Sequence, residues 1–447
     1  MFHDYTQGAV SRNIWLLARP MILEQLVLAS YQLLDGVWMG RLGTTELAGL
    51  VMSETLFFVL SSATQGLAVG ATAAVARRAG EREFGAASHS AWQVLFLAVG
   101  LGIVIGGIGF VLAEPLLVLL GASSEVASVA AAYLRIACGG LFVLMLMQAC
   151  NAILRGAGEA GCALKVMVLG FGLPMLLDPL LILGWGPFGG LGLAGGALAV
   201  VVGACCGLGY AIWVLKKGRR RIGLGAGLGR PDSRLMWRII RVGLPAWLQM
   251  LLRSAAGVVV LGVIALFGTN AVAGYSAAIR IVMFAFIPCF GLGNAAATLV
   301  GQNLGAGKPE RSSRSAWLSA SYSVLYMAVM TVVFVALPEP ILSQFSRDPL
   351  VLAVAVPALR IVASTQAFNA VGVVMGQSLS GAGHTVPGMF VNLGTLWGLQ
   401  VPSAYLLTHH TDLGVVGVWM TFAIVNVANG SLYAFWFHRG GWRKQEV

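Results

Sequence analysis

The chain has 447 residues, of which 58% are hydrophobic and only 10% are charged, and its formal net charge is +11. Soluble domains typically contain ~45–50% apolar and ~25% charged residues, so this chain has too few polar side chains to cover a surface in water. The composition excludes soluble, fibrous, disordered and disulfide-rich secreted proteins, and it indicates a polytopic membrane protein.

Twelve apolar stretches are long enough to cross a bilayer, which needs about 20 residues per helix. Their approximate limits are 14–40, 47–76, 91–113, 126–154, 163–184, 191–215, 239–267, 271–301, 316–337, 351–379, 387–408 and 413–437. We therefore predict an all-α fold with twelve transmembrane helices. An even number of spans places both chain ends on the same side of the membrane.

Lys and Arg are distributed unevenly between the connections. Only Arg41 and Arg347 lie in the short odd-numbered connections, whereas the even-numbered ones carry many more, most densely at 216–221. This pattern follows the positive-inside rule and predicts that both termini are cytoplasmic. Membrane topology thus explains the basicity, and we expect no nucleic-acid partner.

The two halves of the chain repeat each other. An offset of 225 residues aligns Pro20 with Pro245, Gly43-Thr44 with Gly268-Thr269, and Leu134-Arg135-Ile136 with Leu359-Arg360-Ile361. Each half holds six spans, so the two copies share one orientation. Parallel six-helix repeats are a transporter architecture with the substrate path between the halves. We predict an amino-terminal lobe at 1–215, a basic cytoplasmic linker at 216–238 and a carboxy-terminal lobe at 239–447.

Sequence patterns that resemble nucleotide-binding motifs lie in positions where such sites do not form. Gly291-x-Gly293-x-x-Ala296 lies inside an apolar span and fits helix packing better than nucleotide binding. Gly307-Lys308 lacks the first glycine and the following hydroxyl of a phosphate loop. The six cysteines form no C-x-x-C pair and are interpreted as small core residues. We expect no enzyme activity, no metal and no cofactor, so that uphill transport would draw on an ion gradient.

Four acidic residues lie within the predicted spans, all in the first half: Glu24, Asp35, Glu54 and Asp178. An ionisable group inside the bilayer is costly and is therefore a candidate functional residue. Glu24, Tyr31 and Asp35 lie on one helical face, because they are separated by seven and four residues. A structural role remains the alternative, above all for Glu24 and Glu54.

Several segments carry the pattern of a known family. They are Leu34-Asp35-Gly36-x-x-Met39-Gly40-Arg41-Leu42-Gly43, Tyr133-Leu134-Arg135-Ile136, Leu177-Asp178-Pro179-Leu180 and the stretch from Val300-Gly301-Gln302-Asn303 to Lys308-Pro309-Glu310-Arg311. Together they resemble the MATE (multidrug and toxic compound extrusion) transporters over nearly the whole chain. The resemblance implies an antiporter of the bacterial inner membrane, in which a cationic amphipathic compound leaves while protons or sodium ions enter. Alternating access between the lobes and a monomeric state are expected.

The restriction of the acids to the first half is similar to the DinF-type branch of that family. By this resemblance, Asp35 and Asp178 couple transport to the cation. Tyr31 and Asn151 match residues that line the cavity, to which Glu24 and Glu54 are added as candidates.

Two positions depart from the family pattern. Pro174 stands where Asn is usual, and Val200 stands where Thr is frequent. Both lost groups would be oxygen donors to a small cation, so the departures favour protons over sodium. Pro174 and Pro20, which matches a first-helix proline of the family, each lack an N–H, and we predict that they localise helix bending.

Three alternatives are also compatible with parts of this sequence. Sodium-coupled export would keep the same fold and substrates. A lipid-linked saccharide flippase of the same superfamily would tend to have extra spans and a cationic cavity. An integral membrane enzyme would need a catalytic constellation. Twelve spans with four acids in the first half favour the proton-coupled exporter.

Overall fold

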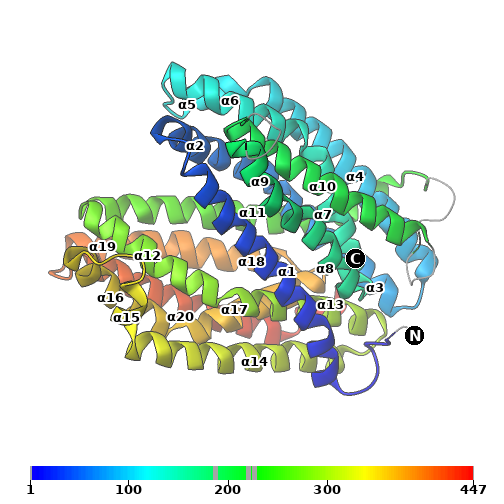
Figure 1. Ribbon diagram of the computed structural model, residues 1–447. Coiled ribbons are helices and arrows are strands. Elements are labelled where there is room, and N and C mark those ends of the chain that lie inside the picture. Colours follow the sequence, from blue (N-terminus) through cyan, green and yellow to red (C-terminus); the bar gives the residue numbers. More distant parts are fainter. Residues whose placement is uncertain (1–2, 185–189, 218–222, 224–228, 446–447) are drawn as a thin grey trace.

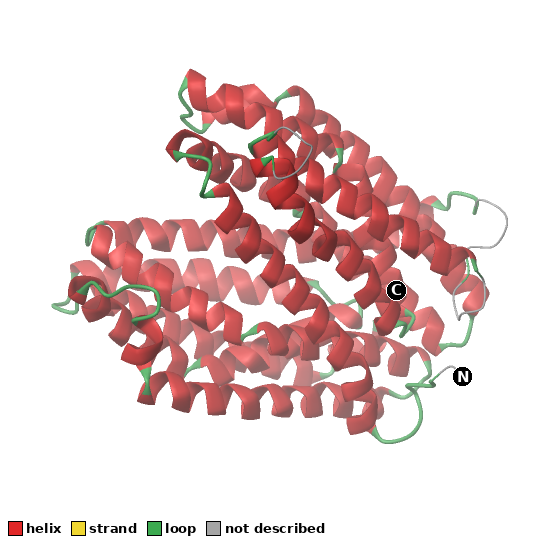
Figure 2. Ribbon diagram, in the orientation of Figure 1, coloured by secondary structure: helices red, strands yellow, loops and turns green. Residues whose placement is uncertain are grey.

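The computed structural model describes residues 3–184, 190–217, 223 and 229–445, and over these residues its regular elements are all helices (Figures 1 and 2). The helices form two bundles, which we call the amino-terminal lobe (α1–α10) and the carboxy-terminal lobe (α11–α20). Figure 1 shows the first lobe above the second. Most of the predicted basic linker, at 218–222 and 224–228, lies outside the described residues.

The amino-terminal lobe contains ten α-helices and one π-helical segment within its described residues. They are α1 (Val10–Met39), α2 (Thr44–Ser61), α3 (Ala63–Gly80), α4 (Phe84–Val111), α5 (Ala113–Leu119), α6 (Ser124–Gly139), α7 (Leu141–Gly156), α8 (Ala160–Met167), η1 (Val168–Gly172), α9 (Leu173–Leu183) and α10 (Leu193–Lys216).

The carboxy-terminal lobe has the same order of elements. They are α11 (Ser233–Ala265), α12 (Thr269–Ala285), α13 (Ile287–Gly305), α14 (Pro309–Ala336), α15 (Pro338–Leu342), α16 (Pro349–Ser364), α17 (Gln366–Gly381), α18 (Val386–Asn392), the π-helical η2 (Leu393–Gln400), α19 (Val401–His409), α20 (Val415–Arg439) and a final 3-10 turn, η3 (Gly441–Lys444).

The internal repeat extends to the irregular parts of the two lobes. The π-helical segments begin at Val168 and Leu393, and the short helices α5 and α15 begin at Ala113 and Pro338. Each pair is offset by the 225 residues seen in the sequence. This agreement confirms the predicted fold of two parallel six-helix repeats.

The predicted spans correspond to helices, several of which are bent. Within the described part of the chain, eight helical segments are long and apolar enough to cross a membrane. Three bent pairs add three more, with angles of 45° between α6 and α7, 43° between α12 and α13, and 53° between α16 and α17. The continuous helical stretch 386–409 matches the remaining predicted span at 387–408. Apolar composition alone did not reveal the bends, because it continues through them.

Polar caps extend some helices beyond their apolar limits. The Asp232 carboxylate accepts hydrogen bonds from the backbone N–H groups of Arg234 at 2.9 Å and Leu235 at 3.2 Å. This cap starts α11 at Ser233, rather than near the predicted limit of 239. The difference arises because a search for apolar residues does not detect a polar first turn.

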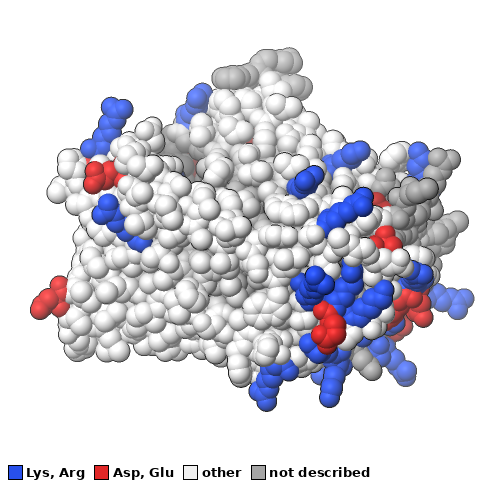
Figure 3. Space-filling view, turned by 90° about the horizontal axis from the view of Figure 1, so that it is seen from below, with Lys and Arg blue, Asp and Glu red and all other residues white. Residues whose placement is uncertain are grey.

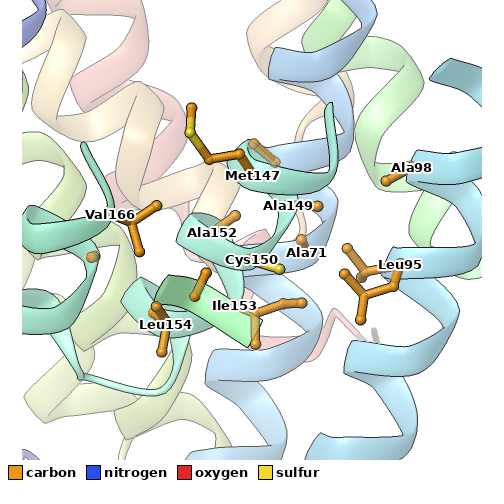
Figure 4. Close-up of a cluster of buried hydrophobic side chains, with 14 of the residues drawn as sticks. Ala71, Leu95, Ala98, Met147, Ala149, Cys150, Ala152, Ile153, Leu154 and Val166 are labelled. Carbon is orange, nitrogen blue, oxygen red and sulfur yellow. The ribbon is translucent and has the colours of Figure 1, made fainter. Parts of the chain in front are cut away.

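Small side chains form much of the core of the amino-terminal lobe. Figure 4 shows part of this core, where Ala71 of α3, Ala98 of α4 and Ala152 of α7 let the helices approach closely around Cys150. Four of the six cysteines are buried, as predicted. The prediction is wrong for Cys205 and Cys206, which are exposed on α10; their apolar neighbours did not reveal which face of the helix they occupy.

Basic side chains are concentrated at one end of the molecule (Figure 3). Both termini lie at this end (Figure 1), and most of the Lys and Arg visible in Figure 3 gather there, which is why we call it the basic end. Large apolar side chains are exposed elsewhere, for example Val104 at 59%, Val258 at 69% and Val332 at 68%. An apolar surface of this kind suits a lipid environment.

The lobes meet through α1, α3, α11 and α13. Gly66 of α3 lies against the Gly243 carbonyl of α11, where an added Cβ would sit 2.6 Å from the oxygen. Nearer the basic end, Gly80 contacts the Gln302 carbonyl of α13 so closely that any side chain would overlap it. The opposite ends of the lobes lie apart in Figure 1, where α2 and α6 diverge from α16 and α19.

Candidate functional site

The first helix belongs to both lobes. In its first half, Leu17 and Met21 pack against Leu292 of α13 in the carboxy-terminal lobe. In its second half, Tyr31 joins the core of the amino-terminal lobe. Helix α1 continues without interruption through the predicted bending residue, Pro20. Groups on α1 are therefore placed to respond to a change in the relative position of the lobes.

Asp35 of α1 lies close enough to Asp178 of α9 for its charge to act on the Asp178 carboxyl group. Both are buried, with 5% and 0% of their surfaces exposed. Neither oxygen of Asp178 has a hydrogen-bond partner, and the same is true of Oδ1 of Asp35. Burying two carboxyl groups together without a cation is unfavourable, so this position favours a bound proton or a cationic ligand.

Two tyrosines lie within electrostatic range of both aspartates. Tyr31 of α1 was expected from the sequence, and its ring packs 5.6 Å from that of Phe171 in η1. Tyr133 of α6 was not singled out as a site residue, although it lies in a segment that carries the family pattern. We call Asp35, Asp178, Tyr31 and Tyr133 the aspartate cluster.

The two departures from the family pattern, Pro174 and Val200, both lie in the amino-terminal lobe. Pro174 is buried at the start of α9, directly after η1. Gly203 of α10 allows this approach, since a Cβ there would lie 2.6 Å from the Pro174 ring. Val200 packs against the hydrophobic core of the lobe. Both positions therefore present apolar side chains, and neither supplies an oxygen ligand.

Glu24 forms a different constellation on α1. It is eleven residues before Asp35, which is roughly 16 Å along a helix. Oε2 of Glu24 lies 3.5 Å from Nδ2 of Asn151 and 3.9 Å from Nη1 of Arg155, both on α7. Glu24 and Asn151 are buried, at 3% and 1% exposure. We call Glu24, Asn151 and Arg155 the Glu24 triad.

Glu54 has a third kind of environment. It lies on an exposed face of α2, and its charge reaches Asp35. It is thus at the margin of the aspartate cluster and not in its buried interior. Among the described residues, no group of three or more His, Cys, Asp or Glu side chains could hold a metal ion.

The carboxy-terminal lobe contains a network of neutral polar groups, which does not stand out in the sequence because its members carry no charge. Gln249 of α11 donates to the Thr385 carbonyl at 3.0 Å and accepts from the Tyr433 hydroxyl at 3.3 Å. Asn429 of α20 donates to Oδ1 of Asn392 at 3.2 Å. We call this set the amide network.

The amino-terminal segment, residues 3–9, contacts both lobes at the basic end. Asp4 pairs with Arg82 at 2.8 Å, and the Tyr5 hydroxyl donates to the Gly158 carbonyl at 3.2 Å. From the other lobe, Nζ of Lys308 donates to the Thr6 carbonyl at 2.9 Å. The segment therefore holds the two lobes together at this end.

Comparisons with known proteins agree with this arrangement. The sequence profile of the MatE family matches residues 20–180 and again 245–406, which start 225 residues apart. The chain is 26% identical to a probable multidrug resistance protein NorM of Thermotoga maritima, over 98% of this chain and 94% of the relative. It is 25% identical to an FAD transporter of Shewanella oneidensis, over 96% and 94%.

One solved structure with a similar fold is the outward-facing conformation of a multidrug resistance MATE family transporter. Its TM-score is 0.91 and its sequence identity is 26%, over 99% of this chain and 98% of that chain. The fold, the 225-residue internal repeat and the match to the family profile thus all indicate the same family over most of the sequence. The chain is a multi-pass membrane transporter that belongs to the MatE family.

Proposed function

We propose that this protein exports cationic amphipathic compounds in exchange for protons, by alternating access between its two lobes. The observation that carries the proposal is the buried pair of carboxyl groups, Asp35 and Asp178, without a cationic partner in the aspartate cluster. Such a pair needs either protons or a positively charged ligand to offset its burial.

Exchange follows from this competition. When the aspartates are charged, they attract a cationic compound; two unit charges 4 Å apart interact by about 4 kcal/mol at an effective dielectric constant of 20, before desolvation is subtracted. When protons bind the aspartates, this attraction is lost and the compound leaves. The surrounding aromatic rings of Tyr31 and Phe171 would contact the apolar part of the compound.

The apolar environment of Pro174 and Val200 supports protons as the coupling ion. Sodium ions are held by several oxygen ligands, and here these two positions supply none. A proton needs only one carboxyl oxygen. Sodium-coupled export would require further oxygen ligands from elsewhere in the aspartate cluster.

The acidic interior also distinguishes substrate classes. The relative in Shewanella oneidensis is an FAD transporter, and FAD is an anionic flavin nucleotide. Asp35 and Asp178 would repel such an anion. A lipid-linked pyrophosphate would be repelled for the same reason. Cationic amphiphiles are therefore the substrates that the described residues favour.

We further propose that the basic end faces the cytoplasm of a bacterial cell, with the protein in the inner membrane and both termini inside. The concentration of Lys and Arg at this end supports the orientation. Because the lobes are joined at the basic end, this arrangement corresponds to an outward-facing state, as in the solved relative. One chain contains both lobes, so a monomer would suffice.

Transport by purified protein in liposomes tests the proposal. A panel of cationic, neutral and anionic dyes is loaded on one side, and a pH gradient or a sodium gradient is imposed separately. We expect cationic dyes to move against their gradient only when a pH gradient is present. Transport of anionic dyes, or movement of dye driven by sodium alone, would contradict the proposal.

A further inference from the structure

The end of α7 is a docking point for the other lobe. Thr298 and Gln302 of α13 donate hydrogen bonds to the carbonyls of Arg155 at 3.3 Å and Gly156 at 2.8 Å. Two residues later, the Gly158 carbonyl accepts from Tyr5. Three carbonyls within four residues thus bind α13 and the amino-terminal segment.

Glycine is required at this docking point. Gly158 has a φ of +83°, which L side chains rarely adopt, and an added Cβ would lie 2.7 Å from the Tyr5 ring. The absence of a side chain at Gly158 therefore lets Tyr5 approach the backbone closely. The position of these carbonyls depends on how the last turn of α7 is held.

Arg155 connects this turn to α1. Its backbone carbonyl takes part in the contact between the lobes, while its guanidinium lies 3.9 Å from Glu24 and has only 20% of its side-chain surface exposed. Its Nε atom is buried without a hydrogen-bond partner. Glu24 supplies the charge that makes this burial tolerable, because a buried cation without a counter-charge is strongly unfavourable.

The position of Glu24 along α1 strengthens this connection. Glu24 lies between Met21, which packs against the carboxy-terminal lobe, and Tyr31, which packs within the amino-terminal lobe. It therefore attaches α1 to α7 at the point where α1 passes from one lobe to the other. A change at Glu24 would therefore act on both α1 and α7.

The other lobe provides an internal comparison. The residue that follows Glu24 by 225 positions is Gln249, which is neutral, and both ends of its amide have hydrogen-bond partners. In contrast, Oε1 of Glu24 and Oδ1 of Asn151 are buried without partners. The position of Glu24 thus belongs to a charged, loosely bonded triad, whereas its equivalent, Gln249, belongs to a neutral amide network.

We propose that Glu24 is a positioning residue for the contact between the lobes at the basic end, acting through Arg155. Its negative charge holds the guanidinium against α1 and so keeps the carbonyls of Arg155, Gly156 and Gly158 in place for α13 and Tyr5. Loss of that charge frees Arg155 to move towards water and loosens the contact. This role is separate from the cation exchange proposed for Asp35 and Asp178.

Hydrogen–deuterium exchange of the full-length protein in lipid nanodiscs tests the proposal, without substrate or ion gradient. We expect Glu24→Gln to increase exchange at least about threefold at 297–305 of α13 and 153–158 of α7, since local opening controls exchange. Glu24→Asp, which keeps the charge, should restore part of the protection. Wild-type exchange at both segments in Glu24→Gln would overturn the proposal.

Two further variants sharpen the test. Arg155→Met should increase exchange at the same segments, and combining it with Glu24→Gln should add little, because both changes remove one interaction. Fully additive effects would contradict action through Arg155. Arg155→Met also carries the test if Glu24→Gln does not fold.

A matched control comes from another pair in the same lobe. Glu114→Gln removes an exposed Arg–Glu pair, whose partner Arg135 is 3.3 Å away. It should leave both segments at wild-type exchange, and an equal increase there would show that any lost carboxylate loosens the lobe. Because no transport is measured, this outcome is independent of whether the protein exchanges protons for drugs.

Discussion

Asp35 and Asp178 lie 143 positions apart in the chain, on α1 and α9, and yet both carboxyl groups are buried and the charge of Asp35 acts on Asp178. Helix α1 brings Asp35 into the amino-terminal lobe, and close packing of α10 against α9 keeps Asp178 in its interior.

The first prediction concerns the coupling ion. Because Pro174 and Val200 supply no oxygen ligand, export by the wild-type protein should not change when sodium replaces potassium at constant pH on both sides. Dye efflux from proteoliposomes measures this directly. Efflux that requires a sodium gradient would show that other oxygens complete a sodium site.

The second prediction concerns Glu54. Its side chain is exposed on α2, and its charge reaches Asp35 from the margin of the aspartate cluster. Glu54→Gln should slow pH-driven efflux by less than about tenfold, which is about 1.4 kcal/mol of activation free energy, because Glu54 lies outside the buried interior of the cluster. A complete loss of transport with normal membrane insertion would place Glu54 among the essential coupling residues.

The third prediction concerns Pro20. It lacks a backbone N–H, so the helical hydrogen bond that would end at this position in α1 is absent. Pro20→Ala restores that bond and should stiffen α1, which leaves insertion intact and lowers the initial rate of efflux several-fold.

Pro349→Ala is the matched control for Pro20→Ala. Pro349 is the first residue of α16, where no helical hydrogen bond is lost. Its substitution should leave turnover unchanged. If Pro20→Ala also has normal turnover, bending at this proline does not contribute to the transport cycle.

The fourth prediction concerns pH and the amino-terminal segment. Partial burial raises the pKa of Asp4, but hydrogen bonds from the Thr6 hydroxyl and backbone N–H, together with Arg82, more than offset this and lower the pKa to about 2. Because the pKa is lowered, the Asp4 carboxylate stabilises the folded state at every pH above its ordinary pKa of 3.8. This stabilisation is lost only as the pH falls towards 2.

Between about pH 5 and 8, Asp4 should therefore stay charged, and the protection of the segment should be constant. Limited trypsin cleavage after the exposed Arg12 measures this protection. Asp4→Asn should increase cleavage equally across this range. If cleavage of the wild-type protein rises steeply between about pH 8 and 5, a different group controls the segment.

Much of the fold could be predicted from the sequence, because the membrane imposes a simple rule. A span needs about 20 apolar residues, and the 225-residue repeat is visible in Pro20 and Pro245. The breaks at Gly140 and Thr365 could not be predicted, since apolar residues continue on both sides. The π-helical segments depend on a shifted hydrogen-bond register that composition does not encode.

The candidate site could be predicted only in part, from the rarity of charged side chains within membrane spans. Asp35 and Asp178 were identified as acids within apolar spans, whereas Tyr133 resembles any interfacial aromatic residue in the sequence. The pairing of Glu24 with Arg155 depends on how α1 crosses α7, and no local pattern contains that geometry. Neutral groups such as Gln249 were missed because amides are not conspicuous in composition.

The most direct test of the account is pH-driven efflux of a cationic dye by Asp35→Asn and Asp178→Asn in proteoliposomes, beside the wild-type protein. Each substitution keeps the side-chain volume and imitates a permanently protonated carboxyl group. We predict that Asp35→Asn lowers efflux to the rate of empty liposomes and that Asp178→Asn weakens or abolishes it, while both variants insert and elute as the wild type does. Wild-type efflux by both variants would contradict the central claim that these two aspartates couple export to protons.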